Sequence, residues 1–331
     1  MRLKSNLAAD GALMLTTLIW GSTFFMAKDI LGVWPPMAYM FVRFAGAAVL
    51  LAAMFPRRLL RARGEEWRAG ATLGLLMGVG FGLQAAGQVY TTASKSAFVT
   101  GLTTPLVPFV AYLILRARPG VENLLGVVFA SLGGLLILAP QGADTSVNLG
   151  DMLTLAAIAL FATHITLMSV YARRYDVRQL TVLQIACIAA LFAVVWGGLR
   201  VWGSVWGAET LPDALARETL PLVWNGRIVW QLVYLATVAT VGAFLCWTWG
   251  QARTTPTHAA IIFSLEPIFA TAFAVAVLGA GEWMGGRGWL GAALVFAGII
   301  ISETRWSERR ERNRAGRERQ KADEVAREAE G

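Results

Sequence analysis

FGLQAAGQVYTTASKSA, residues 81–97, recurs later in the chain as FLCWTWGQARTTPTHAA, residues 244–260. At an offset of 163, the two stretches share a phenylalanine, a Gly-Gln pair and a double threonine. Leu-Gly at 125–126 and Gly at 133 recur at 290–291 and 298, and LIWGSTF at 18–24 aligns more faintly with ALFATHI at 159–165, at an offset of 141. An insertion near residues 200–227 explains the change of offset. The chain is therefore predicted to contain two related halves.

The composition is that of an integral membrane protein. Of the 331 residues, 56% are hydrophobic and only 15% are charged, whereas soluble domains carry about 25% charged residues. Ten apolar runs are long enough, or nearly so, to cross a hydrocarbon core as helices. Their continuity lacks the alternation of barrel strands, so the predicted fold is all-α. The runs are residues 8–28, 36–55, 69–89, 96–115, 122–139, 150–171, 179–199, 228–250, 257–279 and 286–302.

The charges between these runs predict the orientation. Segments on the side of the N-terminus are rich in arginine, most clearly residues 57–68, while the opposite segments hold few basic residues. By the positive-inside rule, both termini lie in the cytoplasm. The net charge of +8 is then mainly a topology signal, and no nucleic-acid partner is needed to explain it. The first run is interpreted as an uncleaved span, because it is long for a signal peptide.

Five spans in each half give the second half the opposite sense across the membrane. The predicted organisation is a first repeat at 8–140, a second repeat at 149–303 and a charged cytoplasmic tail at 304–331. Inverted repeats of this kind are typical of secondary transporters, in which substrate binds near the midplane between the halves.

Several motifs taken together resemble the EamA-type transporters of the drug/metabolite transporter superfamily. They are LIWGSTFFMAK in the first span, FVRFAGAA in the second, GLQAAGQVYTTASKSAFVTGL across the third and fourth, and SLEPIFATAFAVAVLGAGE from the ninth. The resemblance covers residues 8–303. It implies ten helices in two EamA repeats, a bacterial inner-membrane location and, often, export of amino acids or other small metabolites.

Three ionisable side chains are predicted to lie deep in apolar runs: Arg43, His164 and Glu266. A charge near the bilayer centre costs roughly 2.5–3.5 kcal/mol, so each should face protein or a wet cavity. Arg43 and Glu266 either pair with each other or with freed carbonyls, or they border the substrate path, where Arg43 attracts a carboxylate and Glu266 an amine or a proton. For His164 a hydrogen-bonded interior histidine is the favoured interpretation.

Prolines interrupt corresponding spans of the two halves. Pro105 and Pro108 lie in the fourth span and Pro267 in the ninth. Paired interruptions of this kind point to a central binding site in inverted-repeat transporters. Thr103 aligns with Glu266, so the two halves do not share the carboxylate.

Polar and aromatic side chains add further candidates for the substrate path. Gln84 and Gln88 are one turn apart and either bind substrate or join helices; in the repeat they become Trp247 and Gln251. Trp20 and Trp247 are candidates for flat apolar walls. The same third span carries glycines at every fourth position, which predicts close helix packing; they are Gly70, Gly74, Gly78 and Gly82.

Other chemistry has little support. Cys187 and Cys246 lie inside apolar runs, which argues against a disulfide framework, and His164 and His258 lack further ligands at metal-binding spacing. No cofactor is predicted, and no Walker loop indicates ATP coupling. The leading interpretation is a secondary transporter of small organic solutes embedded in the lipid bilayer. The alternatives are a multi-pass enzyme acting on a lipid-linked substrate and a structural or sensory protein. The sequence leaves open proton coupling and the choice between monomer and homodimer.

Overall fold

The computed structural model describes residues 7–116, 119–138, 148–172, 174–251, 262–263 and 265–303. Within these residues every regular element is helical and no strand occurs. The predicted tail, Thr254, Thr255 and His258 lie outside the described residues. The all-α prediction is therefore confirmed for the described part of the chain.

Seven segments are long and apolar enough to cross a membrane. They are α1 (Leu7–Leu31), α2 (Pro36–Met54), α4 (Gly64–Tyr90), the pair α5 (Ala93–Gly101) and α6 (Thr103–Leu115), α8 (Leu149–Tyr171), α9 (Val177–Trp206) and the run α11 (Gly226–Ala236), η3 (Thr237–Gly242) and α12 (Ala243–Gln251). Three shorter apolar helices overlap the remaining predicted runs: α7 (Val121–Leu138), α14 (Glu266–Leu278) and α15 (Gly285–Glu303).

Side-chain caps fix the starts of several helices. Asn148 and Asp151 form a capping box at α8, and Thr92 accepts a hydrogen bond from the backbone of Lys95 at the start of α5. Asp176 and Asn225 cap α9 and α11 in the same way. Such caps satisfy backbone N–H groups that have no partner within the helix.

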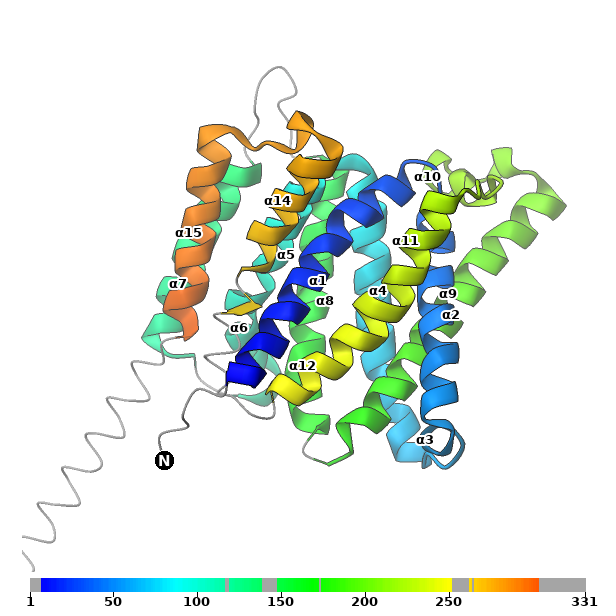
Figure 1. Ribbon diagram of the computed structural model, residues 1–331, viewed down its shortest axis with the longest axis horizontal. Helices are drawn as coiled ribbons and strands as arrows, with labels where there is room; N and C mark the ends of the chain where they lie inside the picture. The colour runs from blue at the N-terminus through cyan, green and yellow to red at the C-terminus, as the bar shows by residue number, and fades with distance from the viewer. Residues whose placement is uncertain are drawn as a thin grey trace, which may run out of the picture.

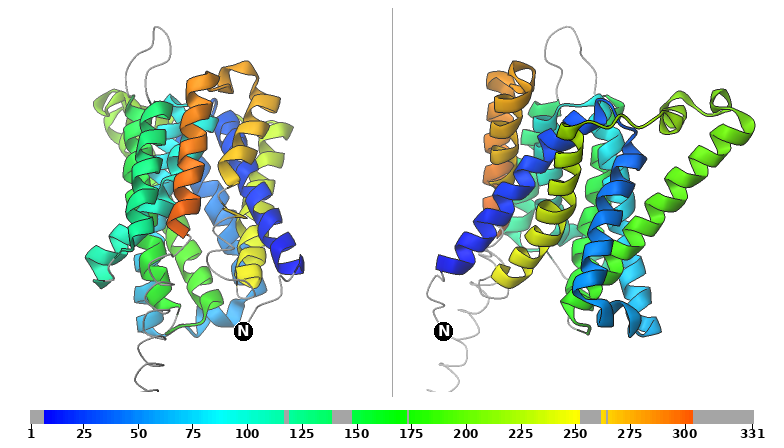
Figure 2. Two further views of the ribbon diagram at one scale, coloured as in Figure 1. Left: turned by 90° about the vertical axis from the view of Figure 1, so that its left-hand side faces the viewer. Right: turned by 45° about the vertical axis from the view of Figure 1, so that its right-hand side comes forward.

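The helices form one bundle (Figure 1). The first residues of α1 and the last of α15 lie on the same side of it, together with the arginine-rich short helix α3 (Pro56–Leu60). This side is the predicted cytoplasmic side. The short elements α10 (Asp213–Ala216) and η2 (Arg217–Thr219) lie at the opposite end, in the predicted insertion. Figure 2 shows α9 leaning away from the bundle toward this insertion.

The insertion is anchored to the start of α2. The Glu218 carboxylate accepts hydrogen bonds from the Met37 backbone N–H at 3.2 Å, and only 2% of the residue is exposed. The indole of Trp34 donates to the Val223 carbonyl at 2.7 Å and packs edge-on against Trp224. The loop between α1 and α2 is thereby held against the insertion.

The glycine stripe of α4 packs directly on α9. A Cβ added at Gly74 would lie 2.8 Å from the Gln184 carbonyl oxygen and 2.7 Å from the Cβ of Cys187. Gly70, Gly78 and Gly82 face Leu183, Leu191 and Phe192 in the same manner. Because a glycine has no Cβ, the backbones approach closely there.

A second close seam joins α7 and α15, which lie side by side in both figures. A Cβ added at Gly291 would lie 2.6 Å from the Gly133 carbonyl oxygen, and one at Gly298 would lie 2.5 Å from the Gly126 carbonyl oxygen. Thus each of the two helices contributes two glycines to one antiparallel contact.

Candidate functional site

Two interrupted helices meet inside the bundle. The fourth predicted span breaks at Leu102, between α5 and α6, one turn before Pro105; a proline at this position cannot donate a backbone hydrogen bond to Gly101. Pro108 lies inside α6 without ending it. Pro267 lies in the first turn of α14, and its ring is 3.4 Å from a Cβ built on Gly101. The two interruptions are therefore in contact; we call this place the junction.

Glu266 begins α14 at the junction and is half-buried. Its carboxylate makes no hydrogen bond or ion pair with any described residue. Thr103, at the start of α6, is 7% exposed, and its hydroxyl also has no partner among the described residues. The hydroxyl of Thr271, on α14, is buried and equally unpartnered. Buried polar groups normally have partners, so these unsatisfied groups mark the junction as a candidate binding site.

An aromatic cluster adjoins the junction through α1. Gly21 of α1 packs on α14, and a Cβ built there would lie 3.3 Å from the Glu266 carbonyl oxygen. The preceding residue, Trp20, stacks on Phe263 at 5.7 Å between ring centroids and meets Trp247 edge-on at 5.8 Å. Phe244 completes the cluster, 5.6 Å from Trp247. The two predicted tryptophans thus lie together, one on α1 and one on α12.

The structure contains no ion pair between Arg43 and Glu266, so the predicted mutual pairing is not formed. Arg43 is buried on α2 and donates to the Tyr39 hydroxyl at 3.2 Å and to the Thr240 hydroxyl at 3.3 Å. Its guanidinium also lies 5.3 Å from the centre of the Phe44 ring. The deep cation is satisfied by hydroxyls and rings, and no carboxylate is needed.

Thr240 belongs to η3, a π-helical turn between α11 and α12. Its hydroxyl donates to the Leu235 carbonyl at 2.8 Å, five residues back, as the wider turn allows. Turns of this kind inside α-helices are frequent at functional sites. The sequence TVATVG reads as ordinary apolar helix, so sequence analysis missed the feature.

The remaining predicted side chains join helices. Gln84 donates to the Thr100 hydroxyl at 2.7 Å, and Gln88 donates to the Phe24 carbonyl at 2.9 Å. His164 is buried and lies 2.9 Å from the amide oxygen of Gln184 on α9, in agreement with the favoured interpretation of an interior hydrogen-bonded histidine. Gln251 is the last residue of α12.

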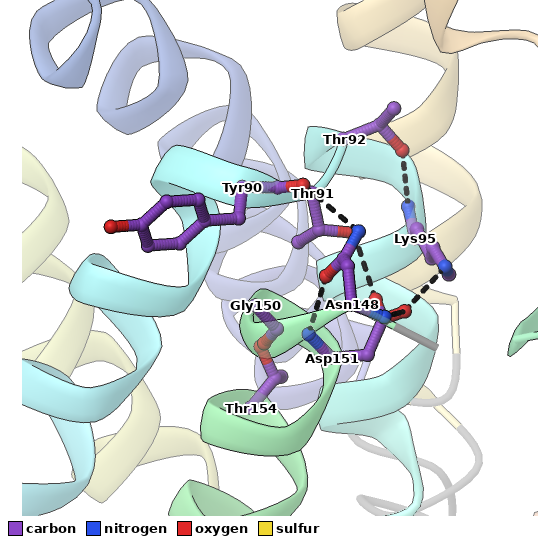
Figure 3. Close-up of polar contacts among 8 residues, drawn as sticks. All are labelled: Tyr90, Thr91, Thr92, Lys95, Asn148, Gly150, Asp151 and Thr154. Carbon is purple, nitrogen blue, oxygen red and sulfur yellow. Dashed lines mark hydrogen bonds and ion pairs between the residues drawn. The ribbon is translucent and has the colours of Figure 1, made fainter. Parts of the chain in front are cut away.

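A polar cluster that sequence analysis missed ties α4, α5 and α8 together (Figure 3). The carboxylate of Asp151 binds the Lys95 ammonium at 2.6 Å and accepts from the Thr91 hydroxyl at 3.0 Å. Asn148 donates to the Tyr90 carbonyl at 3.0 Å. We call this set of residues the polar cluster; it lies at the end of the bundle opposite α3. Its members are Tyr90, Thr91, Lys95, Asn148 and Asp151.

Two more charged side chains close the same end. Lys28 of α1 donates to the carbonyls of Gln88 at 2.8 Å and Thr91 at 2.7 Å, so its cation stabilises the C-terminus of α4. Glu282, in η4 (Ala280–Glu282), accepts from the first N–H groups of α5, at 3.2 Å from Ala93 and 2.9 Å from Ser94. Sequence analysis did not single out Lys28 or Lys95.

Together, the apolar helices and the polar groups deep within them define a multi-pass helical membrane protein. The sequence profile of the EamA-like transporter family matches residues 7–139 and 148–304. The chain belongs to this family and is a membrane transporter.

Named relatives agree with this assignment. An uncharacterized transporter of Archaeoglobus fulgidus is 30% identical over 303 residues, which is 91% of this chain and 87% of the relative. The uncharacterized transporter YyaM of Bacillus subtilis is 23% identical over 86% of this chain and 90% of its own length. The uncharacterized inner membrane transporter YedA of Escherichia coli K12 is 31% identical over 43% of this chain and 50% of its own length.

A solved structure titled "Crystal structure of protein" shares the fold. It aligns with a TM-score of 0.59 at 19% sequence identity, covering 90% of this chain and 97% of the other chain.

Proposed function

We propose that the protein is a secondary transporter that moves small organic metabolites through the junction by alternating access, and that it exports them across a bacterial inner membrane. The observation that carries the proposal is the contact between two interrupted helices at Gly101 and Pro267, next to Glu266, whose carboxylate has no partner among the described residues. Interrupted helices facing each other from two halves are the common construction of central sites in such transporters.

The glycine seam between α7 and α15 supports ten spans in two inverted repeats. The repeat aligns Gly126 with Gly291 and Gly133 with Gly298. The contacts in the structure join the other combinations, Gly126 with Gly298 and Gly133 with Gly291. A two-fold axis in the membrane plane, which exchanges the halves, converts each of these contacts into the other.

The polar cluster supports a state that is closed at the predicted non-cytoplasmic end. There the Asp151 carboxylate, 1% exposed, holds α8 to α4 and α5 through Thr91 and Lys95. Alternating access requires a second state in which this end opens, so these contacts have to separate during the cycle. Conformational transitions commonly switch an interface between two packed arrangements, and the contacts of the polar cluster would form in only one of them.

The test is solute counterflow in liposomes containing the purified protein. A panel of radiolabelled amino acids, amines and other metabolites is offered to vesicles preloaded with the same unlabelled solute. We expect accumulation of at least one solute, recovered chemically unchanged, and its loss with Glu266→Gln. Glu65→Gln, an exposed carboxylate, is the matched control and should keep wild-type flux.

The same vesicles decide between the alternatives. Conversion of a solute without flux would establish an enzyme and overturn the proposal. Flux that is unaffected by Glu266→Gln would remove the junction from the transport path. An imposed pH gradient, measured in parallel, determines whether flux is coupled to protons.

A further inference from the structure

We infer that the junction selects an organic cation, an alkyl- or arylalkylamine without a carboxylate, over the corresponding amino acid. The inference rests on the proposed transport function and specifies the substrate class of the same site. It follows from which charges at the junction are already satisfied and which remain free.

The deep cations of the described residues are all engaged elsewhere. Arg43, on α2, is held by Tyr39 of the same helix and by Thr240 of η3. Lys28 and Lys95 bind helix carbonyls and Asp151 at the end of the bundle. No described cation is therefore placed at the junction to receive a substrate carboxylate.

The buried carboxylates named above, by contrast, accept hydrogen bonds, whereas no residue in the described ranges donates one to Glu266. Asp151 has Lys95, and Glu282 has the first N–H groups of α5. Glu218 has the N–H of Met37. Glu266 is half-buried, and no described residue donates a hydrogen bond to its carboxylate. A carboxylate without a partner in a low-dielectric site attracts a cation strongly.

The neighbouring groups suit an ammonium with an apolar body. The hydroxyl of Thr103, buried and unpartnered, lies at the start of α6 beside the Gly101–Pro267 contact and can accept an ammonium N–H. The indole N–H of Trp20 already donates to the Ala239 carbonyl at 3.1 Å, so the ring offers its faces and edges only. Aromatic faces bind cations and apolar groups alike.

An added carboxylate would be costly here. The parent amino acid of an amine carries the same side chain and the same ammonium, but it would bring a second charge that no described residue pairs. A buried charge without a partner is strongly unfavourable. A site that leaves a polar group of the ligand unpaired discriminates against it, and we expect the amine to bind about tenfold or more tightly than its amino acid.

Matched ligands test the inference on the wild-type protein. Phenethylamine, tyramine and tryptamine are compared with phenylalanine, tyrosine and tryptophan, each pair differing by one carboxylate. Binding to the detergent-purified full chain is measured as the concentration-dependent rise in melting temperature. At least one amine should stabilise the protein, and its amino acid should need about tenfold or higher concentration for the same rise.

Variants locate the binding. Glu266→Gln should abolish stabilisation by the amine, Glu266→Asp should retain part of it, and Glu65→Gln should match wild type. Equal or tighter binding of the amino acids, no binding of any amine, or full amine binding by Glu266→Gln would overturn the inference. If amino acids bind and are transported in a Glu266-dependent manner, the proposed transport function stands and only the substrate class is wrong. Because the amine and amino-acid comparison uses wild-type protein, it remains decisive even if Glu266→Gln fails to fold.

Discussion

Replacing Asp151 by asparagine should destabilise the protein by removing one charge from the polar cluster. The Asp151 side chain is 1% exposed and its carboxylate binds Lys95 at 2.6 Å, Thr91 at 3.0 Å and the Asn148 backbone N–H at 3.2 Å. Asparagine keeps the shape and one oxygen acceptor, but it removes the charge and replaces the other acceptor with an NH2 donor. Breaking a buried ion pair costs about 3–5 kcal/mol. Lys95 is 19% exposed and can partly reach water, which reduces the expected loss to about 2–3 kcal/mol.

The assay is the free energy of unfolding in mixed detergent micelles, followed by circular dichroism during titration with sodium dodecyl sulfate. Lys95→Met and the double variant complete a double-mutant cycle. In the Lys95→Met background, Asp151→Asn should lower the free energy of unfolding much less than it does in the wild-type protein. The difference between the two losses is the coupling free energy, which we expect to be about 1–3 kcal/mol. A loss below about 0.5 kcal/mol for Asp151→Asn, with no coupling to Lys95, would refute the reasoning, because values of that size are typical of exposed pairs.

Three further outcomes are expected. Burial raises the pKa of Glu218 to about 7 from 4.5. Because the folded protein then binds the proton more tightly than the unfolded chain, the free energy of unfolding falls by about 3 kcal/mol as pH rises through this interval. Glu218→Gln should reduce this dependence of stability on pH, measured by thermal denaturation between about pH 4.5 and pH 8. The same dependence on pH in the variant as in the wild type would disprove this role of Glu218. Gly133→Ala should cost about 1–3 kcal/mol because the new methyl meets the backbone of α15. Gly197→Ala, inside α9 with nothing within 4 Å, should leave the protein as stable or stabilise it by up to about 1 kcal/mol in the same melts. Arg43→Gln should lower the unfolding free energy by about 1–3 kcal/mol, and Thr240→Val less; stability unchanged in both would contradict the structural role given to Arg43.

The periodic and compositional features of the fold could be predicted from the sequence. Apolar runs set the positions of the helices, because a span must satisfy its backbone internally. The prolines predicted an interruption in the fourth span, although the break falls at Leu102 and Pro108 only lies within α6. The glycine stripe predicted close packing but not its partner, which is α9.

The partners of polar residues could not be predicted, since they depend on which helices become neighbours. Arg43 and Glu266 are complementary charges at similar depth, and pairing them is the simplest assumption. In the structure Arg43 instead donates a hydrogen bond to Thr240. The position of Thr240 depends on a π-helical turn that leaves no signal in the sequence. Asp151 and Lys95 are 56 positions apart and lie at helix ends, where charged residues are ordinary.

The most direct test of alternating access at the junction is the accessibility of Thr103 from the two faces of the membrane. Thr103→Cys, in a background with Cys187→Ser and Cys246→Ser, is labelled with a membrane-impermeant maleimide in right-side-out and inside-out vesicles. The account predicts labelling mainly from the cytoplasmic face with the polar cluster intact. Adding Asp151→Asn should shift labelling toward the opposite face. Labelling from neither face, or labelling whose distribution between the faces does not change with Asp151→Asn, would contradict the account.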